Sequence, residues 1–364
     1  MRILILNWRC PRNPRAGGAE AFTFEVARRL VAEGDEVEWF SAAFPSAAAA
    51  EELDGVQLVR KGMQWTVHWE AYRRYRHSIS KRFDAVIDEV NTVPFFTPLW
   101  CEIPRWMLIF QLAREVWWYE SPFPLSALGY AAEPQYLKCY RTTPVLTISN
   151  STETDLRRLG FSAPITVLPI GVEHIVEPVR KKQSVPTFLY VGRLVPSKRI
   201  GDIVRAFAAF HEEARAGQLW LIGEGNESYV RHLKAEATAL DVVDKVEFCG
   251  RVSAREKHQR MAAAHMLLMA SVREGWGLAT SEAAACGTPS VVYDSPGLRD
   301  AVSDGETGRV VSPSPGALAK AMLQLWNDPS LYRRMAAAAR ESAGRLSFDV
   351  TTALFRGAIG QASN

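Results

Sequence analysis

The sequence predicts an α/β protein with two domains, each built on a mostly parallel sheet with helices on both faces. The first observation is length, because 364 residues exceed the usual domain size of about 100–200 residues. The second is the repeated alternation of short apolar, β-rich runs with longer helical patterns. The third is a polar, charged break over residues 173–186, after which the alternation restarts.

The first half begins with a β-rich run at residues 2–6, then a Pro/Gly-rich loop and a helical pattern over about 19–32. Later strands are expected at residues 36–40, 84–88, 107–110, 145–148 and 166–168. Asn150 and Glu153 read as a capping box, which is a structural role at the start of a helix.

After the break, the second half repeats the pattern. Strands are expected at residues 187–191, 219–222, 246–248, 266–269 and 290–293, and helices from about 200, 227 and 278 and over 317–326, 331–345 and 350–361. The predicted organisation is a first domain at 1–172, a linker at 173–186, a second domain at 187–345 and a last helix within 346–364. Two such sheets bind ligands in crevices at the carboxyl ends of their strands.

Composition excludes several classes of protein. Lys and Arg number 43 against 40 for Asp and Glu, a net charge of +3, which disfavours binding to nucleic acid. The five cysteines stand singly, without metal-ligand spacing, so neither a zinc site nor a disulfide framework is expected. The apolar run near the first residue is too short for a signal peptide or a membrane span. A cytoplasmic protein is expected, at most lying on the inner face of a membrane.

The strongest candidate site is the segment 271–283, which follows an apolar strand and opens a helix. Gly275 and Gly277 permit a tight turn, and the unpaired amides at the helix start suit a phosphate. Glu274 in the loop is suited to sugar hydroxyls, and Glu282 inside the helix to a ribose diol. The alternative is an ordinary turn whose glutamates complement the helix N-terminus. Two spaced carboxylates with two glycines favour a site, and Trp276 and Leu278 belong to the same segment.

The second candidate is the turn 190–199, which closes the first strand of the second half. After Gly192, Arg193 offers a planar fork and Lys198 a point charge, both suited to a diphosphate. No Asp-x-Asp pair occurs in the sequence, so these cations are expected to neutralise a diphosphate leaving group without a metal. A solvated basic turn is the alternative, and it is preferred for Arg199.

Three further glycine loops are weaker candidates. Gly17 and Gly18 lie between a strand and a helix start, where phosphate or sugar can approach the backbone, although Gly-Gly is also an ordinary turn. Gly223 and Gly225 lack the third glycine of a dinucleotide fingerprint. Arg251 and Val252 follow another strand, in a loop compatible with contact to a nucleotide base.

Taken together, these motifs resemble the retaining glycosyltransferases of the GT-B fold, specifically family GT4. Glu274 and Glu282 match the E-x7-E motif of that family, and the resemblance covers nearly the full length. It implies a nucleotide-sugar donor in the second domain and a sugar, lipid-linked or small-molecule acceptor in the first. Arg193 and Lys198 would neutralise the diphosphate, Glu274 would contact the donor sugar and Glu282 the ribose. Neither a cofactor nor a metal is implied, and the last helix would cross back to the first domain.

The sequence departs from the family at Phe110, where members often carry a His, which raises the alternative of a catalytically silent nucleotide-sugar-binding protein. A sugar-nucleotide epimerase or a phosphorylase on the same fold is the other alternative, because fold does not choose the reaction.

Aromatic residues gather in the first half, where six tryptophans flank a basic stretch at 72–82: Trp65, Trp69, Trp100, Trp106, Trp117 and Trp118. A helix mixing aromatic and basic residues can lie on an anionic membrane surface, whereas burial in a core is the usual place of a single tryptophan. Peripheral membrane contact and a lipid-linked acceptor follow as expectations. The nucleotide, the sugar and the oligomeric state are not given by the sequence.

Overall fold

The computed structural model describes residues 1–172 and 181–360. By their contacts the residues group into two units. The first comprises Met1–Arg114, Leu128–Gly171 and the residues from Ser347 onward, and the second comprises Glu115–Ala127 and Val172–Leu346. The segment 115–127 thus groups with the second unit, although it lies inside the range predicted for the first domain. Residues 173–180 of the predicted linker lie outside the described residues.

The first unit holds a sheet in which eight described strands are ordered β3-β4-β2-β1-β5-β6-β7-β8. Its strands are β1 (Arg2–Leu6), β2 (Glu36–Ser41), β3 (Ala50–Leu53), β4 (Val56–Arg60), β5 (Ala85–Glu89), β6 (Arg105–Leu108), β7 (Val145–Thr147) and β8 (Ile165–Val167). All neighbours are parallel except β3 and β4. The central strands are buried, as strands covered on both faces must be, and they are apolar except for Arg2 in β1 and for Asp88 and Glu89, which end β5.

Helices lie between these strands in the chain, and one more follows the second unit. They are α1 (Gly18–Ala32), α2 (Val67–Tyr75), α3 (Ile79–Arg82), η1 (Thr97–Leu99), α5 (Leu125–Leu137), η2 (Lys138–Tyr140), α6 (Asn150–Arg158) and α14 (Phe348–Gly360), of which α5 begins in the segment that groups with the second unit. None of the helices among the described residues is long and apolar enough to span a bilayer.

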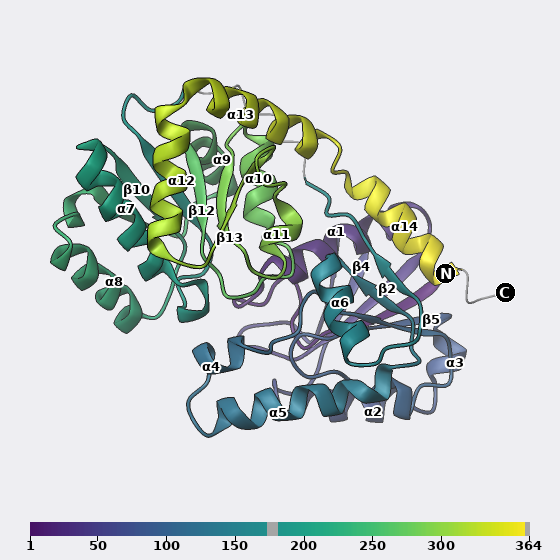
Figure 1. Ribbon diagram of the computed structural model, residues 1–364. Helices are drawn as coiled ribbons and strands as arrows, with labels where there is room; N and C mark the ends of the chain where they lie inside the picture. The colour runs from purple at the N-terminus through teal and green to yellow at the C-terminus, as the bar shows by residue number, and fades with distance from the viewer. Residues whose placement is uncertain (173–180, 361–364) are drawn as a thin grey trace. The chain divides into compact units, whose positions relative to one another are not determined.

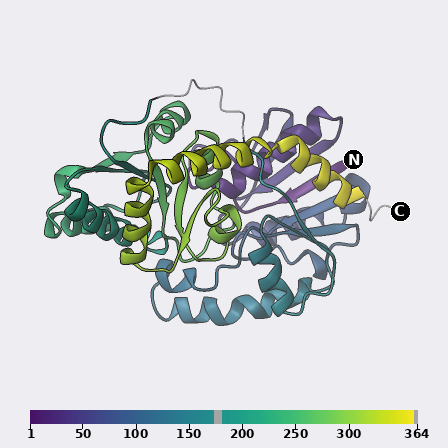
Figure 2. The same cartoon turned by 45° about the horizontal axis from the view of Figure 1, so that its top comes forward.

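In the second unit, six described strands form an all-parallel sheet ordered β11-β10-β9-β12-β13-β14. They are β9 (Thr187–Val191), β10 (Gln218–Ile222), β11 (Val246–Gly250), β12 (Met266–Met269), β13 (Ser290–Tyr293) and β14 (Gly308–Val311). The helices are α4 (Val116–Glu120), η3 (Pro196–Lys198), α7 (Ile200–Ala214), α8 (Glu227–Ala239), η4 (Val243–Lys245), α9 (Ala254–Ala263), α10 (Leu278–Ala285), α11 (Leu298–Ala301), α12 (Pro315–Asn327) and α13 (Pro329–Gly344). Figures 1 and 2 show helices on both faces of this sheet.

In each sheet, the strand that comes first in the sequence lies in the middle, and the later strands are added on both sides of it, so the strand order reverses at that point. In the first unit β1 lies between β2 and β5, and in the second unit β9 lies between β10 and β12. At such a point the loops after the two central strands diverge and leave a crevice, which is where open α/β sheets bind ligands. The predicted motifs follow β1, β9 and β12, so the topology brings them to these two points.

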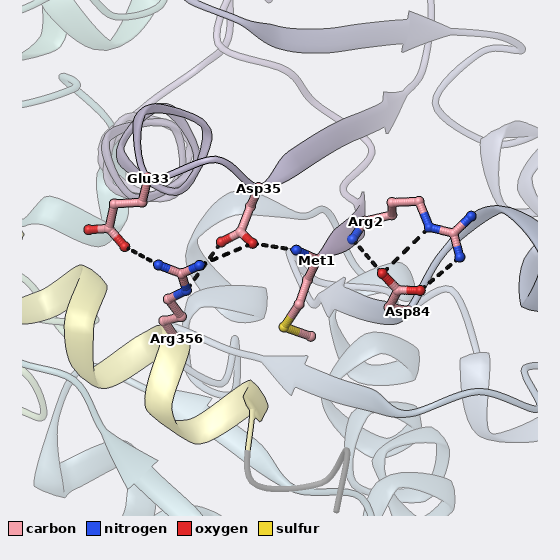
Figure 3. A network of polar contacts seen from close by, with 6 residues as sticks. All are labelled: Met1, Arg2, Glu33, Asp35, Asp84 and Arg356. Atoms are coloured by element: carbon pink, nitrogen blue, oxygen red, sulfur yellow. Dashed lines mark hydrogen bonds and ion pairs between the residues drawn. The ribbon is translucent and has the colours of Figure 1, made fainter.

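The helix α14 packs on α1 of the first unit through both apolar and ionic contacts (Figure 1). The ring of Phe348 lies 5.9 Å from that of Phe22. Figure 3 shows the ionic part, in which Arg356 Nη1 is 2.8 Å from Glu33 Oε2 and Arg356 Nε is 3.4 Å from Asp35 Oδ2. Asp35 also pairs with the Met1 amine at 2.5 Å, so α14 is tied to the start of β1 as well as to α1.

One predicted helix start is wrong by a residue. Asn150 is the first residue of α6, and the cap is Ser149, whose side chain accepts a hydrogen bond from the Thr152 amide at 3.3 Å. Three consecutive residues, Ser149 to Ser151, are all good cap formers, so sequence alone does not fix which one takes the position.

We predict that Gly171→Ala destabilises the first unit. A methyl group at 171 would overlap the Phe348 ring and lie 2.6 Å from the Phe348 Cα, and such overpacking costs about 1–3 kcal/mol. Gly357→Ala is the matched control, because position 357 is exposed inside α14 with open space around it and should gain roughly 0.5–1 kcal/mol. Denaturant unfolding measures both, and equal midpoints for the two variants would contradict the packing of α14.

Candidate functional site

The turn after β9 presents Arg193 at the carboxyl edge of the second sheet. Position 192 needs glycine, because a Cβ there would lie 2.8 Å from the Tyr190 hydroxyl. That hydroxyl donates to the Arg193 carbonyl oxygen at 2.8 Å and so holds the turn. The Arg193 side chain is 62% exposed, and its Nη1 lies 3.9 Å from Glu120 Oε2 of α4. The guanidinium is therefore accessible to a ligand.

Lys198 and Glu274, predicted from separate motifs, meet in an ion pair. Lys198 Nζ is 2.6 Å from Glu274 Oε1, and the Ser271 hydroxyl donates to the same oxygen at 2.7 Å. The two loops are also joined by their backbones, since the Val272 amide donates to the Ser197 carbonyl oxygen at 3.0 Å. Glu274 is thus fixed by a cation and a hydroxyl at the point where β9 and β12 end.

The helix α10 begins directly after Gly277, which adopts a left-handed φ of +94° that favours glycine. Leu278 is its first residue, and the Trp276 indole N–H donates to the Ser281 hydroxyl at 2.9 Å across the first turn. Gly275 lies between Glu274 and this turn. The start of α10 therefore follows Glu274 closely in the chain, and the unpaired amides of a helix start suit a phosphate.

The loop that carries Glu274 is also held by a close approach of the loop before α11. The Glu274 amide donates to the Pro296 carbonyl oxygen at 3.0 Å, and a Cβ on Gly297 would overlap the Glu274 carbonyl oxygen. Gly297 also has a left-handed φ of +84°. The loop before α11 therefore fixes the position of the Glu274 backbone. Sequence reasoning missed this role.

Glu282 lies in α10 and is already paired. Lys257 Nζ of α9 lies 2.7 Å from Glu282 Oε1 and 2.8 Å from its Oε2. The Glu282 side chain is 26% exposed, so the carboxylate remains accessible to a hydroxyl ligand. Lys257 was missed by sequence reasoning, because a single lysine in a polar helix gives no signal of what it faces.

Of the remaining loops at this edge of the sheet, the one after β10 packs on a neighbouring loop, and the one after β11 is partly exposed. A Cβ on Gly223 would overlap the Gly192 carbonyl oxygen and one on Gly225 the Leu194 carbonyl oxygen, so these glycines are explained by packing of the β10 loop on the β9 loop. Arg251 follows β11 and is exposed, and Val252 beside it is half-buried. Among the described residues, neither a hydrogen bond nor an ion pair joins Arg251 or Val252 to Glu274 or Glu282.

In the first unit, the loop after β1 carries Gly17 and Gly18 at the start of α1. Glu20 closes this loop, since its Oε2 accepts from the Gly17 amide at 2.7 Å. Its Oε1 lies 2.8 Å from Arg9 Nε and accepts from Asn91 Nδ2 at 2.6 Å. Asn91 follows β5, so Glu20 bridges the two loops at the first sheet's reversal point.

A second carboxyl group, Glu89 at the end of β5, is buried in the same place. Burial, and after it the charge of Glu20, raises the pKa of Glu89 well above its ordinary value. The side chains of Thr23 and Asn7 interact with it and oppose that rise. This environment favours the neutral form of the Glu89 carboxyl group, and no sequence motif pointed to Glu89.

Phe110, which stands where the resembled family often has a His, lies two residues after β6. Its ring meets that of Phe22 edge to face at 5.4 Å, and its carbonyl oxygen accepts from the Thr152 hydroxyl at 2.9 Å. Both contacts are structural, within the first unit.

The tryptophans of the first half differ in environment. Trp106 is buried in the core at 2% exposure, whereas Trp65 and Trp69 are 82% and 60% exposed. Trp69 belongs to α2, whose opposite face buries Val67, Ala71 and Tyr75. The core interpretation is therefore correct for Trp106, and α2 presents an aromatic, basic outer face.

Comparison with known families covers most of the chain with two matches. Residues 16–174 match the family model described as Glycosyltransferase Family 4, and residues 172–342 match the one described as Glycosyl transferases group 1.

Two curated relatives illustrate the similarity in sequence. A Mycobacterium tuberculosis glycogen synthase is 32% identical over 183 residues, which are 49% of this chain and 44% of that protein. A Bacillus anthracis N-acetyl-alpha-D-glucosaminyl L-malate synthase is 30% identical over 162 residues, or 44% of this chain and 41% of that protein. The matches thus span less than half the length of these relatives.

Solved structures share the fold over the whole chain. A sucrose-phosphate synthase from Thermosynechococcus elongatus superposes with a TM-score of 0.83 at 20% identity, covering 99% of this chain and 98% of that one. The Anabaena protein Alr3699/HepE, in complex with UDP and glucose, gives a TM-score of 0.75 at 18% identity with both chains fully covered. At these identities the likeness establishes two parallel-sheet α/β domains.

We predict that Gly297→Ala destabilises the second unit by about 2 kcal/mol or more, because it adds a backbone overlap to the strain of a left-handed residue. Gly305→Ala is the control, since position 305 has a similar φ of +79° with open space around it and should cost only about 1 kcal/mol. Unfolding of both variants in denaturant measures the difference. If Gly297→Ala costs no more than the control, the support of Glu274 by this loop is wrong.

Proposed function

Because the chain belongs to the GT-B glycosyltransferases of family GT4, we propose that it transfers a sugar from a nucleoside-diphosphate sugar to a hydroxyl acceptor, with retention of configuration and without a metal. One observation carries the proposal. The β9–β12 reversal point brings together an accessible guanidinium, a lysine–glutamate pair and the start of α10. This arrangement suits an anionic leaving group attached to a sugar.

The diphosphate would bind to Arg193, Lys198 and the first amides of α10. Arg193 offers a fork that matches two phosphate oxygens, and its exposure leaves it accessible. Lys198 would share its charge between Glu274 and the phosphate. The donor sugar would then meet Glu274, whose carboxylate is held in place by Ser271 as well as by Lys198.

The ribose would bind to Glu282, whose carboxylate can accept two hydroxyl hydrogen bonds. Lys257 holds this carboxylate in place before a ligand arrives. Gly192, Gly275, Trp276, Gly277 and Leu278 would form the surrounding wall.

In the proposed reaction, the acceptor hydroxyl attacks the anomeric carbon while the bond from that carbon to the phosphate oxygen breaks. The electron pair of the broken bond leaves with the nucleoside diphosphate, and the hydroxyl proton passes to the departing phosphate. Arg193, Lys198 and the α10 amides offset the charge that develops on that phosphate. No Asp-x-Asp pair is present to hold a metal for this task.

We assign the acceptor to the first unit, at the loop of Gly17 and Gly18. Glu20, Arg9 and Asn91 surround this loop with polar groups, which suits a hydroxyl-rich glycan, lipid-linked saccharide or small molecule. The outer face of α2, with Trp69 exposed above a buried stripe, supports peripheral contact with an anionic membrane and thus a lipid-linked acceptor.

We predict that UDP raises the melting temperature of the protein, because a ligand that binds only the folded state stabilises it. UDP is the first nucleotide to test, since the Anabaena structure of the same fold contains it, and GDP and ADP complete the series. Glu282→Gln should weaken binding of the preferred nucleotide about ten-fold in calorimetry, through loss of a charge-assisted hydrogen bond.

Glu256→Gln is the control for that variant, because Glu256 lies on α9 beside Lys257 but pairs with Arg260. Equal affinities for Glu282→Gln and wild type would remove Glu282 from the ribose site.

We further predict that Arg193→Ala and Lys198→Met each lower the rate of sugar transfer about 10–1000-fold, as expected for loss of one charge-stabilising donor. The control is Arg231→Ala on α8, whose side chain is 71% exposed and pairs only at the surface with Glu227. Transfer should persist in EDTA, and NMR of the product should show the anomeric configuration of the donor.

Three results would count against the proposal. Full activity in both cation variants would remove the diphosphate assignment. Accumulation of an epimer without acceptor would favour the epimerase alternative. Tight nucleotide binding without turnover on any acceptor would favour a silent binding protein.

A further inference from the structure

The short helix α4 holds a carboxylate at the turn to which the diphosphate is assigned. Glu120, its last residue, accepts a hydrogen bond from the Ser197 hydroxyl at 2.5 Å, and its other carboxylate oxygen is 3.9 Å from Arg193 Nη1. Ser197 is the middle residue of η3 and is buried. The two oxygens of the Glu120 carboxylate therefore contact a hydroxyl and a guanidinium, which are also groups that bind phosphate oxygens.

The other end of α4 is anchored nearby. Glu115 Oε2 accepts a hydrogen bond from Arg273 Nε at 3.0 Å. Arg273 is buried and directly precedes Glu274 in the sequence. Both ends of α4 thus rest on the loops after β9 and β12, and α4 packs against η3. All of these residues belong to the second unit.

Ion pairs at both ends hold α4 on these loops, and its aromatic side chains are partly exposed. The Trp118 and Tyr119 side chains are 51% and 42% exposed, so both are only partly buried. The Trp117 indole N–H is buried and finds no hydrogen-bond partner among the described residues. An exposed ion pair contributes little to stability, so the pair of Glu120 with Arg193 is suited to release when a stronger anion competes for that guanidinium.

We propose that Glu120 competes with the nucleotide sugar for Arg193 in the diphosphate site, so that the donor displaces Glu120 when it binds. The inference rests on the proposed function, because it takes Arg193 as a diphosphate ligand. A diphosphate carries more charge than a carboxylate and can bind the guanidinium with two oxygens. It is therefore expected to replace Glu120 as the partner of Arg193. Donor binding therefore releases α4, and with it the segment 115–127 that continues into α5.

Two roles for Glu120 predict effects of opposite sign. As a competitor, Glu120 lowers the fraction of molecules that are ready to bind, and apparent affinity falls in proportion to that fraction. Removing its charge then tightens nucleotide binding. As a positioning residue that orients Arg193 for the ligand, its removal weakens binding.

The experiment compares UDP affinity by calorimetry in wild type, Glu120→Gln and Glu120→Ala, with inorganic pyrophosphate as a second probe without base or sugar. We expect both variants to bind UDP about ten-fold more tightly than wild type. Glu341→Gln on α13 is the control, because it also removes one exposed, paired carboxylate and should leave the affinity unchanged. Hydrogen exchange of the amides in 115–127 should rise on addition of UDP in wild type and be high without UDP in both variants.

Equal or weaker UDP binding by both Glu120 variants, with wild-type binding intact, would overturn the inference and leave the donor site standing. Unchanged hydrogen exchange in 115–127 at saturating UDP would do the same. If no variant and no nucleotide of the UDP, GDP and ADP series shows binding, the proposed function itself fails.

Discussion

The parallel pairing of β9 with β12 is the constraint on which the candidate donor site depends. These strands are far apart in sequence, with two further strands and three longer helices between them, yet they are neighbours in the sheet. Because both strands run in the same direction, the turn with Arg193 and Lys198 and the loop with Glu274 leave the sheet at the same edge. The Lys198–Glu274 pair and the Val272–Ser197 backbone hydrogen bond then fix the two loops to each other.

The candidate sites are electrostatically balanced before any ligand arrives. Glu274 is paired with Lys198, Glu282 with Lys257, and Glu20 with Arg9. Such pairing holds each carboxylate in one orientation, so that little reorganisation is needed when hydroxyl groups or phosphates exchange with the cations. Glu89 differs from these three carboxylates, because burial and, after it, the charge of Glu20 raise the pKa of Glu89 well above its ordinary value.

Sequence reasoning succeeded where the information is local. The alternation of apolar runs and helical patterns predicted two parallel-sheet α/β domains, and the spacing of Glu274 and Glu282 led to the family. It could not identify Lys257, Glu120 or Glu89 as neighbours of the candidate sites, because each contributes through a long-range contact that leaves no pattern around its own position. The cap of α6 was misplaced by one residue for a different reason, since a run of equivalent cap formers is decided by backbone geometry.

The path of the chain through its two units has a consequence for biosynthesis. The first unit is assembled from segments that include 347–360, which emerge from the ribosome only after the whole of 172–346. Its helix α14 contributes a phenylalanine and an arginine to contacts with α1 and β1, so the earlier segments lack these partners during most of translation. The second unit, by contrast, has nearly all of its residues in place before α14 appears. Domains usually fold as units in the order of synthesis, but in this chain the unit that is begun first is completed last.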